Sequence, residues 1–216
     1  RTKFHFSYTA SLSIAIAKVH KISISAKELT QENYCCKNAS ATGFSRGVDS
    51  FDTICSLSEN STEKLSHLTF FNVGSHRSTA NYTPEQSAEL YENRLEIAKK
   101  SAKIFDMPLI DINSNLGEHL TLPYVKVHHY CSFSAVLCMQ KFFKNYYYAS
   151  GYPISSFSIK QCDTGSAHYE AFTASMLSTE STDFYITGLE KTRLEKVDFI
   201  SKFPMTIPRK SNTLYV

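Results

Sequence analysis

The segment from Ser45 to Ser50, with the sequence Ser-Arg-Gly-Val-Asp-Ser, combines residue types and a spacing that could bind phosphate. A short run at 39–44 precedes it and is typical of a buried strand, and residues 51–57 are typical of the start of a helix. Unpaired N–H groups in the first turn of a helix point toward a ligand placed there, and the helix macrodipole adds roughly half a positive charge. The segment therefore predicts an anion site between a strand and a helix.

Three side chains of this loop could complete a nucleotide site. Ser45 and Ser50 could donate hydrogen bonds to phosphate oxygens, and Asp49 could hold a magnesium ion that bridges those oxygens. The alternative is a turn rich in Ser, Gly and Asp that only connects two ordinary elements.

The loop resembles the PP-loop of the N-type ATP pyrophosphatases (adenine nucleotide alpha hydrolase-like), whose signature Ser-Gly-Gly-x-Asp-Ser follows the first strand of a parallel sheet. The departure is Arg46, which stands where the family has its second glycine. Glycine there would allow a positive φ and a close approach of the backbone to pyrophosphate. Arginine would either crowd the phosphates or point outward and add a positive charge. The loop is not of the Walker type, because the chain has no Gly-Lys-Ser/Thr.

The resemblance extends from Gly43 to about Pro204 and points to a less characterised bacterial subgroup of the family. The segments that carry it are 43–45, 48–51, 71–74 and 192–196.

The resemblance implies an enzyme that binds ATP with Mg²⁺ and cleaves ATP between the α and β phosphates. A carboxylate or carbonyl oxygen of a small-molecule substrate would be adenylated, and an amine or sulfur nucleophile would displace AMP. Asp49 would position the magnesium ion, and Asp111 and Asp163 are spare carboxylates for a second metal ligand or a base. The residues implied to hold the nucleotide are Phe44, Ser45, Arg46, Gly47, Val48, Asp49, Ser50, Asn72, Val73 and Gly74.

A second candidate segment, 188–196, runs from the end of a predicted strand into a predicted helix. Arg193 and Lys196 are three residues apart, so they share one helix face and could converge on an anion. By the resemblance, these two residues would neutralise the departing pyrophosphate. The alternative is a solvent-exposed helix on which Lys191 and Lys196 form surface pairs with Glu190 and Glu195.

Besides a purely structural or interaction protein, two other functions remain open. One is an adenine-nucleotide-binding module without catalysis, because Arg46 lies in the phosphate loop. The other is a sulfurtransferase or reductase branch of the same superfamily, which the absence of a Cys-x-x-Cys pair argues against.

Composition limits the partners of the chain. A net charge of +3 is too small to indicate nucleic-acid binding, and no apolar run of the chain is long enough for a membrane span. The cysteines are interpreted as reduced core thiols of a cytoplasmic protein, with Cys131 and Cys138 on one buried helix face. The sequence does not identify the acceptor substrate, and it is compatible with a homodimer. Its specificity loops are expected at 75–82 and 151–168.

From residue 39 onward, short apolar runs alternate with longer amphipathic ones, as the strands and helices of an α/β protein do. We expect a doubly wound, mostly parallel sheet of about five strands with helices on both faces. Residues 1–38 do not follow this pattern and are assigned to an N-terminal segment, and 39–216 form the nucleotide-binding domain. The expected strands are 39–44, 67–73, 109–113, 146–151 (with its exit turn) and 184–188. The expected later helices are 84–105, 123–143 and one that carries Leu194, Val197 and Ile200 on an apolar face.

Overall fold

The structure of the protein is a computed structural model that describes residues 3–4, 24–25, 32–59, 62–76, 82–120, 122–158 and 165–203. Of the N-terminal segment it describes β1 (Lys3–Phe4) and β2 (Ile24–Ser25), which pair antiparallel, and residues 32–38.

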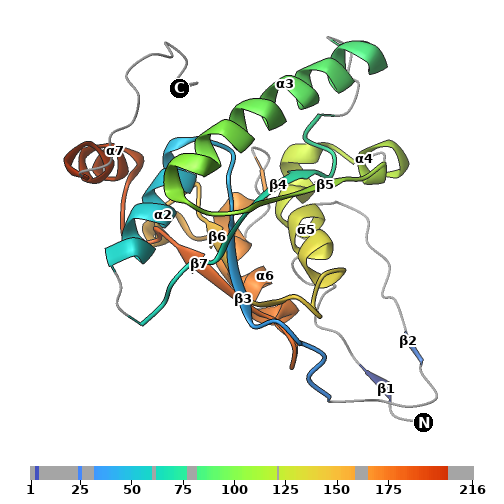
Figure 1. The fold of residues 1–216 in the computed structure, drawn as a ribbon. Coiled ribbons are helices and arrows are strands. Elements are labelled where there is room, and N and C mark those ends of the chain that lie inside the picture. Colours follow the sequence, from blue (N-terminus) through green and yellow to red (C-terminus); the bar gives the residue numbers. More distant parts are fainter. Residues whose placement is uncertain are drawn as a thin grey trace.

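The centre of the molecule is a five-stranded sheet in which every neighbouring pair of strands is parallel (Figure 1). Its order is β5-β4-β3-β6-β7. The predicted α/β sheet with helices on both faces is therefore confirmed. Because β4 lies on one side of β3 and β6 on the other, the winding reverses between β3 and β6, and ligands of such sheets bind beyond the carboxyl ends of the strands at this reversal. The strands are β3 (Ala39–Gly43), β4 (His67–Asn72), β5 (Leu109–Asn113), β6 (Phe143–Ala149) and β7 (Asp183–Thr187).

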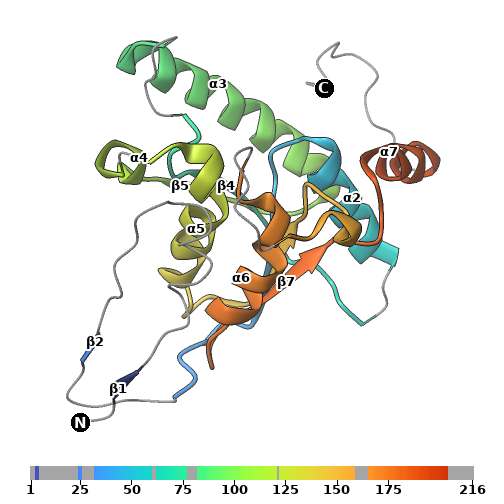
Figure 2. The same cartoon turned by 180° about the vertical axis from the view of Figure 1, so that it is seen from behind.

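Helices cover both faces of this sheet, with α2 and α3 on one face and α5 and α6 on the other (Figures 1 and 2). The α-helices are α2 (Val48–Glu59), α3 (Pro84–Ala102), α4 (Leu116–His119), α5 (Tyr124–Leu137), α6 (Glu170–Leu177) and α7 (Arg193–Lys202). Short 3₁₀ helices are η1 (Lys103–Phe105), η2 (Ile154–Ser156) and η3 (Ala167–Tyr169). None of the described helices is both long and apolar enough to cross a membrane.

Alternating side chains of the strands divide the core between the two faces. Phe70 of β4 packs in the cluster under α2 and α3 together with Leu95, whereas its neighbour Phe71 packs against the clusters of the opposite face. On that opposite face, Phe133 of α5 and Phe184 of β7 are buried together. This alternation with a period of two residues fixes which helices lie over which side of the sheet.

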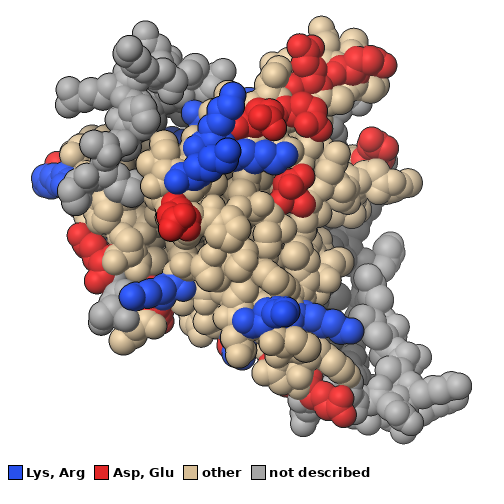
Figure 3. Space-filling view, in the orientation of Figure 1, with Lys and Arg blue, Asp and Glu red and all other residues tan. Residues whose placement is uncertain are grey.

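Helix α3 begins where the sequence predicts, because Thr83 and Gln86 form a capping box and Pro84 is its first residue. Its acidic side chains gather toward the N-terminal end, and Lys99 and Lys100 lie in its last turn (Figure 3). This order of charges complements the helix macrodipole.

The helix expected at 123–143 is shorter than predicted. Helix α5 ends at Leu137, and the chain passes through turns in which the N–H of Phe142 bonds to the carbonyl of Met139 before β6 begins at Phe143. Cys138 is therefore the C-cap residue and is exposed, whereas Cys131 is buried, so the prediction of a shared buried face was wrong.

The apolar face predicted for the last helix was also wrong. Leu194 is 79% exposed and Val197 is 44% exposed, and the fully buried residue of α7 is Lys196. A polar contact with α2, rather than an apolar stripe, therefore determines which side of α7 faces the molecule.

Candidate functional site

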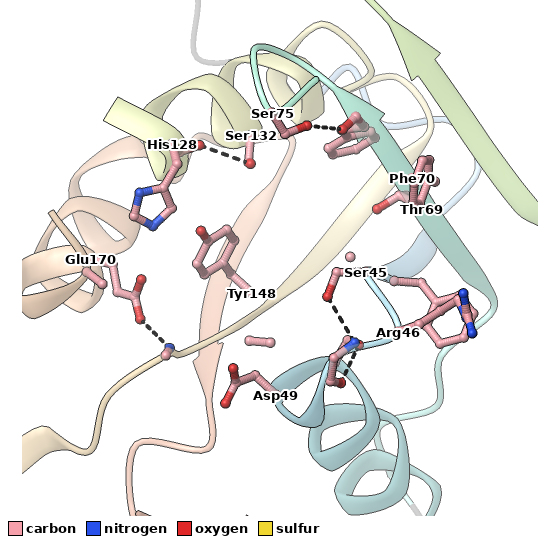
Figure 4. Close-up of a pocket in the computed structure, with 18 of the residues that line it drawn as sticks. Ser45, Arg46, Asp49, Thr69, Phe70, Ser75, His128, Ser132, Tyr148 and Glu170 are labelled. Carbon is pink, nitrogen blue, oxygen red and sulfur yellow. Dashed lines mark hydrogen bonds between the residues drawn. The ribbon is translucent and has the colours of Figure 1, made fainter. Parts of the chain in front are cut away.

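A cavity of about 520 Å³ lies at the carboxyl ends of β3, β4 and β6, beside the reversal of the sheet winding. The loop 45–50 forms one side of it, and side chains of α5 and α6 form the other (Figure 4). The charged and titratable side chains that line it are Arg46, Asp49, His76, Arg94, Tyr124, His128, Tyr146, Tyr148 and Glu170.

The loop is fixed by bonds to the sheet and within itself. The N–H of Phe44 donates to the carbonyl of Thr69 on the neighbouring strand at 2.7 Å. The N–H of Gly47 donates to the Ser45 hydroxyl at 3.3 Å, and the Ser50 hydroxyl donates to the carbonyl of Gly47 at 2.8 Å. A hydroxyl that accepts a bond retains its own hydrogen for donation, so Ser45 can still donate to a ligand.

Arg46 occupies a backbone conformation that favours glycine, with φ at 65°. This is the conformation that the missing glycine would adopt freely, whereas an L side chain there costs about 1–2 kcal/mol. Figure 4 shows Arg46 and Glu170 on opposite sides of the cavity. Arg46 thus keeps the turn that the loop needs and adds a cation to the cavity wall.

Asp49, in the first turn of α2, is held by two cations of α7. Its Oδ1 lies 3.0 Å from the Lys196 Nζ and its Oδ2 lies 3.3 Å from the Arg193 guanidinium. Lys196 Nζ also donates to the carbonyl of Ser150 at the end of β6. The Lys196 side chain is 2% exposed and that of Arg193 is 50% exposed, so the first is fixed in place and the second borders solvent. The alternative of a surface-paired Lys196 is therefore wrong.

Two local features set α7 in this position. Thr192 and Glu195 form a capping box, which places Arg193 and Lys196 in the first turns of the helix. Before it, Lys191 donates to the buried carboxylate of Asp52 at 2.8 Å and to the hydroxyl of Ser56 at 3.0 Å. These bonds attach the start of α7 to α2.

The turn between β7 and α7 depends on Gly188. Its φ is 71°, and a Cβ built there would lie 2.9 Å from both Asp52 Oδ2 and Lys196 Cε. A side chain at this position would therefore collide with the lysine that contacts Asp49.

The wall opposite the loop contains Glu170, a functional candidate that sequence reasoning missed. Glu170 begins α6 and is 2% exposed, and one of its carboxylate oxygens accepts the N–H of Gly151 at 3.3 Å (Figure 4). Burial raises its pKa to about 7, against bonds from Ser150 and Gly151 that lower it. No motif in the sequence marks this residue, because its burial depends on β6 and α6 meeting in space.

Neighbouring side chains on this wall are kept uncharged. Burial raises the pKa of Tyr148 well above its ordinary value of 10, and the nearby Glu170 carboxylate raises it further. Burial lowers the pKa of His128, whose Nδ1 lies 3.2 Å from the carbonyl oxygen of Val125. Tyr124, whose pKa burial raises to about 12, completes the wall.

Several predicted residues lie outside the cavity lining. The Asn72 side chain donates to Asn113 at 2.9 Å, Val73 is 2% exposed, and Gly74 lies against the ring of Tyr124. The adjacent Phe71 and Ser75 line the cavity instead. Asp111 is exposed on the edge strand β5, away from the lining, and Asp163 lies outside the described residues. Val48 begins α2 but does not line the cavity.

Comparison of the chain with protein-family models and with curated proteins finds no match. The assignment of a function therefore depends on the fold, the loop and the cavity described above.

Proposed function

We propose that this protein is an ATP-dependent adenylating enzyme of the PP-loop ATP pyrophosphatase type, which converts ATP to AMP and pyrophosphate. The observation that carries the proposal is the position of the 45–50 loop. It joins β3 to α2 at the reversal of the sheet winding and faces a cavity of about 520 Å³. This volume lies in the range of small-molecule sites, and this position in a parallel sheet is where such sites occur.

The charges around the loop suit a triphosphate. In this proposal the N–H groups of residues 48–50 and the Ser45 hydroxyl hold the pyrophosphate portion of ATP, and the Gly47 N–H and the Ser50 hydroxyl join them by exchanging their bonds within the loop for bonds to phosphate. Lys196 and Arg193, which converge on Asp49, balance the charge that develops on the departing pyrophosphate. Such chemistry depends on positioning and on charge neutralisation. Lys196 and Arg193 lie behind Asp49 and outside the cavity lining, so Lys196 acts through its fixed charge and its hold on Asp49.

Asp49 fits a magnesium ion held jointly with the ATP phosphates. It is the acidic side chain of the loop, it lines the cavity, and it is 24% exposed. Magnesium in such sites is held by one or two carboxylates and by substrate phosphates. When bound, it would neutralise charge on the phosphates, and Arg193, the more exposed of the two cations, is the one free to turn from Asp49 toward them.

The proposed reaction adenylates a carboxylate or carbonyl oxygen of a small molecule, which an amine or sulfur nucleophile then attacks. The described cysteines are free thiols and none of them lines the cavity, which favours a nucleophile from the substrate over a protein thiol. Free thiols also suit a reducing compartment such as the cytoplasm.

Thermal unfolding with ATP and Mg²⁺, with GTP as the control nucleotide, tests the proposal. A ligand at about a hundred times its Kd adds about 2.7 kcal/mol. For a chain of this size we expect Tm to rise by roughly 5–11 °C with ATP. The rise is expected to vanish in the double variant Asp49→Asn, Ser50→Ala. A second assay measures pyrophosphate release with a mixture of small carboxylates and amines, and an absent ATP-selective shift would overturn the proposal.

A nucleotide-binding module without catalysis is the second candidate, and the conformation of Arg46 favours it. The positive φ of Arg46 keeps the loop shape while its side chain occupies the cavity wall, so binding and turnover could be separated. This candidate predicts an ATP-dependent rise in Tm without pyrophosphate release, in both the natural chain and the Arg46→Gly variant.

A further inference from the structure

The cavity has a marked division of charge between its two walls. The side of the loop and β4 is lined by Arg46 and by Arg94 of α3. The carboxylate on this side, Asp49, is paired with Lys196 and Arg193. On the side of α5, β6 and α6, the described lining residues include no lysine or arginine, and the ionisable acid there is Glu170. An anionic substrate group would therefore find its partners on the first wall and not on the second.

The second wall is instead built from acceptors and hydroxyls. It presents the Glu170 carboxylate, the Tyr148 phenol, the His128 ring and the Ser132 hydroxyl (Figure 4). The Tyr124 phenol also belongs to this wall. Glu170 accepts bonds from Ser150 and from the N–H of Gly151, and a carboxylate has acceptor sites for further donors. The neighbouring cation, Lys196, is already paired with Asp49, so the buried Glu170 carboxylate suits a ligand that brings further donors and positive charge.

We propose that the wall formed by α5, β6 and α6 is the subsite of a primary amine, that Glu170 binds the amine as its ammonium ion, and that Glu170 accepts its proton. This inference rests on the proposed adenylation, and it selects the amine among the nucleophiles considered there.

The step balances as follows. The ammonium ion transfers one proton to the Glu170 carboxylate and becomes a neutral amine. The amine nitrogen then forms a bond to the activated carbon, and the bond between that carbon and the phosphate oxygen breaks. AMP leaves with the electron pair of the broken bond, and the nitrogen releases its second proton to solvent.

The electrostatics of Glu170 suit this exchange of a proton. Burial raises its pKa to about 7, so it ionises within the physiological range. The groups that face it are Lys196 from α7, Asp49 from the first turn of α2, Tyr148 from β6 and His128 from α5. Tyr148 is held neutral by a raised pKa, and His128 by a lowered one.

Saturation-transfer NMR with n-butylammonium as the probe and n-butanol as its neutral analogue tests the subsite at pH 8. We expect butylammonium to bind in preference to butanol and Glu170→Gln to weaken its binding by about tenfold, as for the loss of a charged hydrogen bond. The matched control is Glu89→Gln, which removes an exposed carboxylate of α3 and is expected to bind like the natural chain.

A pH titration of the natural chain provides a second readout that needs no variant. Butylammonium should bind about tenfold more weakly at pH 6 than at pH 8, because Glu170 becomes protonated while the probe stays charged. Equal binding of butanol, or unchanged binding to a folded Glu170→Gln variant, would overturn the amine subsite. A flat pH profile would do the same. These outcomes are independent of the Tm shift with ATP, so failure of the subsite is distinguishable from failure of the adenylation proposal.

Discussion

The Lys196 ammonium group lies 3.0 Å from the Asp49 carboxylate, although 147 residues separate the two in the sequence. The same nitrogen donates to the carbonyl of Ser150, so one buried lysine connects the loop after β3, the end of β6 and helix α7. It is 1% exposed, and a buried ammonium ion is stable only with such partners.

We expect Lys196→Met to lower the free energy of unfolding by about 3 kcal/mol, because it leaves Asp49 and the Ser150 carbonyl without their buried donor. Urea denaturation measures the change. The matched control is Lys202→Met on the same helix, where the lysine is 71% exposed and pairs with Asp198. That change should stay within about 0.5 kcal/mol, and an equally small effect at Lys196 would contradict the role assigned to it.

The contact between Lys196 and Asp49 shows where sequence reasoning fails. The central strand β4 was predicted nearly at its observed bounds because a parallel strand buried on both faces is a nearly continuous apolar run. Strand β6 begins three residues before its predicted start, because the residues from Phe143 continue the apolar pattern of the preceding helix. The spacing of Arg193 and Lys196 also indicated a shared helix face. The predicted inner face of α7 was wrong, because an ion pair with a residue far away in the sequence determines which side of the helix is buried. The periodicity of apolar residues carries no information about such a pair. Glu170 was missed for the same reason, since its environment exists only after β6 and α6 meet.

The backbone of Arg46 has a positive φ, a conformation that favours glycine. The energetic cost of this backbone conformation can be measured separately from the contribution of the Arg46 side chain. We expect Arg46→Gly to be more stable than Arg46→Ala by about 1 kcal/mol, since both remove the guanidinium and only glycine relieves the positive φ. This difference corresponds to a Tm difference of about 2–4 °C for a chain of this size. Equal Tm values for the two variants would show that the loop can relax without strain.

Substitutions of Gly188 and Gly151 by alanine form a matched pair. We expect Gly188→Ala to lower the free energy of unfolding by about 2 kcal/mol or more, because a Cβ there would lie 2.9 Å from Lys196 Cε in a backbone with φ at 71°. Gly151→Ala is the control, because nothing lies within 4 Å of its Cβ position. Chemical denaturation compares the two, and equal stabilities would contradict the close packing around Lys196.

The pKa of Glu170 makes the stability of the protein dependent on pH. Its carboxyl group titrates near 7 in the folded state, against an ordinary value of 4.5. Between these two values the folded state binds more protons than the unfolded state, so the free energy of unfolding falls as the pH rises. The loss begins near pH 4.5, is complete above pH 7, and amounts to roughly 3 kcal/mol at about 1.4 kcal/mol for each pKa unit.

The Glu170→Gln variant removes this titration, because an amide does not ionise. We expect the stability of the variant relative to the natural chain to increase by about 2–3 kcal/mol between pH 5 and pH 8, as measured by urea denaturation at each pH. Other titrating groups are common to both proteins, so their contributions cancel in the difference. Glu89→Gln, on the exposed side of α3, should run parallel to the natural chain over the same range. If Glu170→Gln also ran parallel to it, Glu170 would be ionised in the folded protein throughout, and burial would not control its charge.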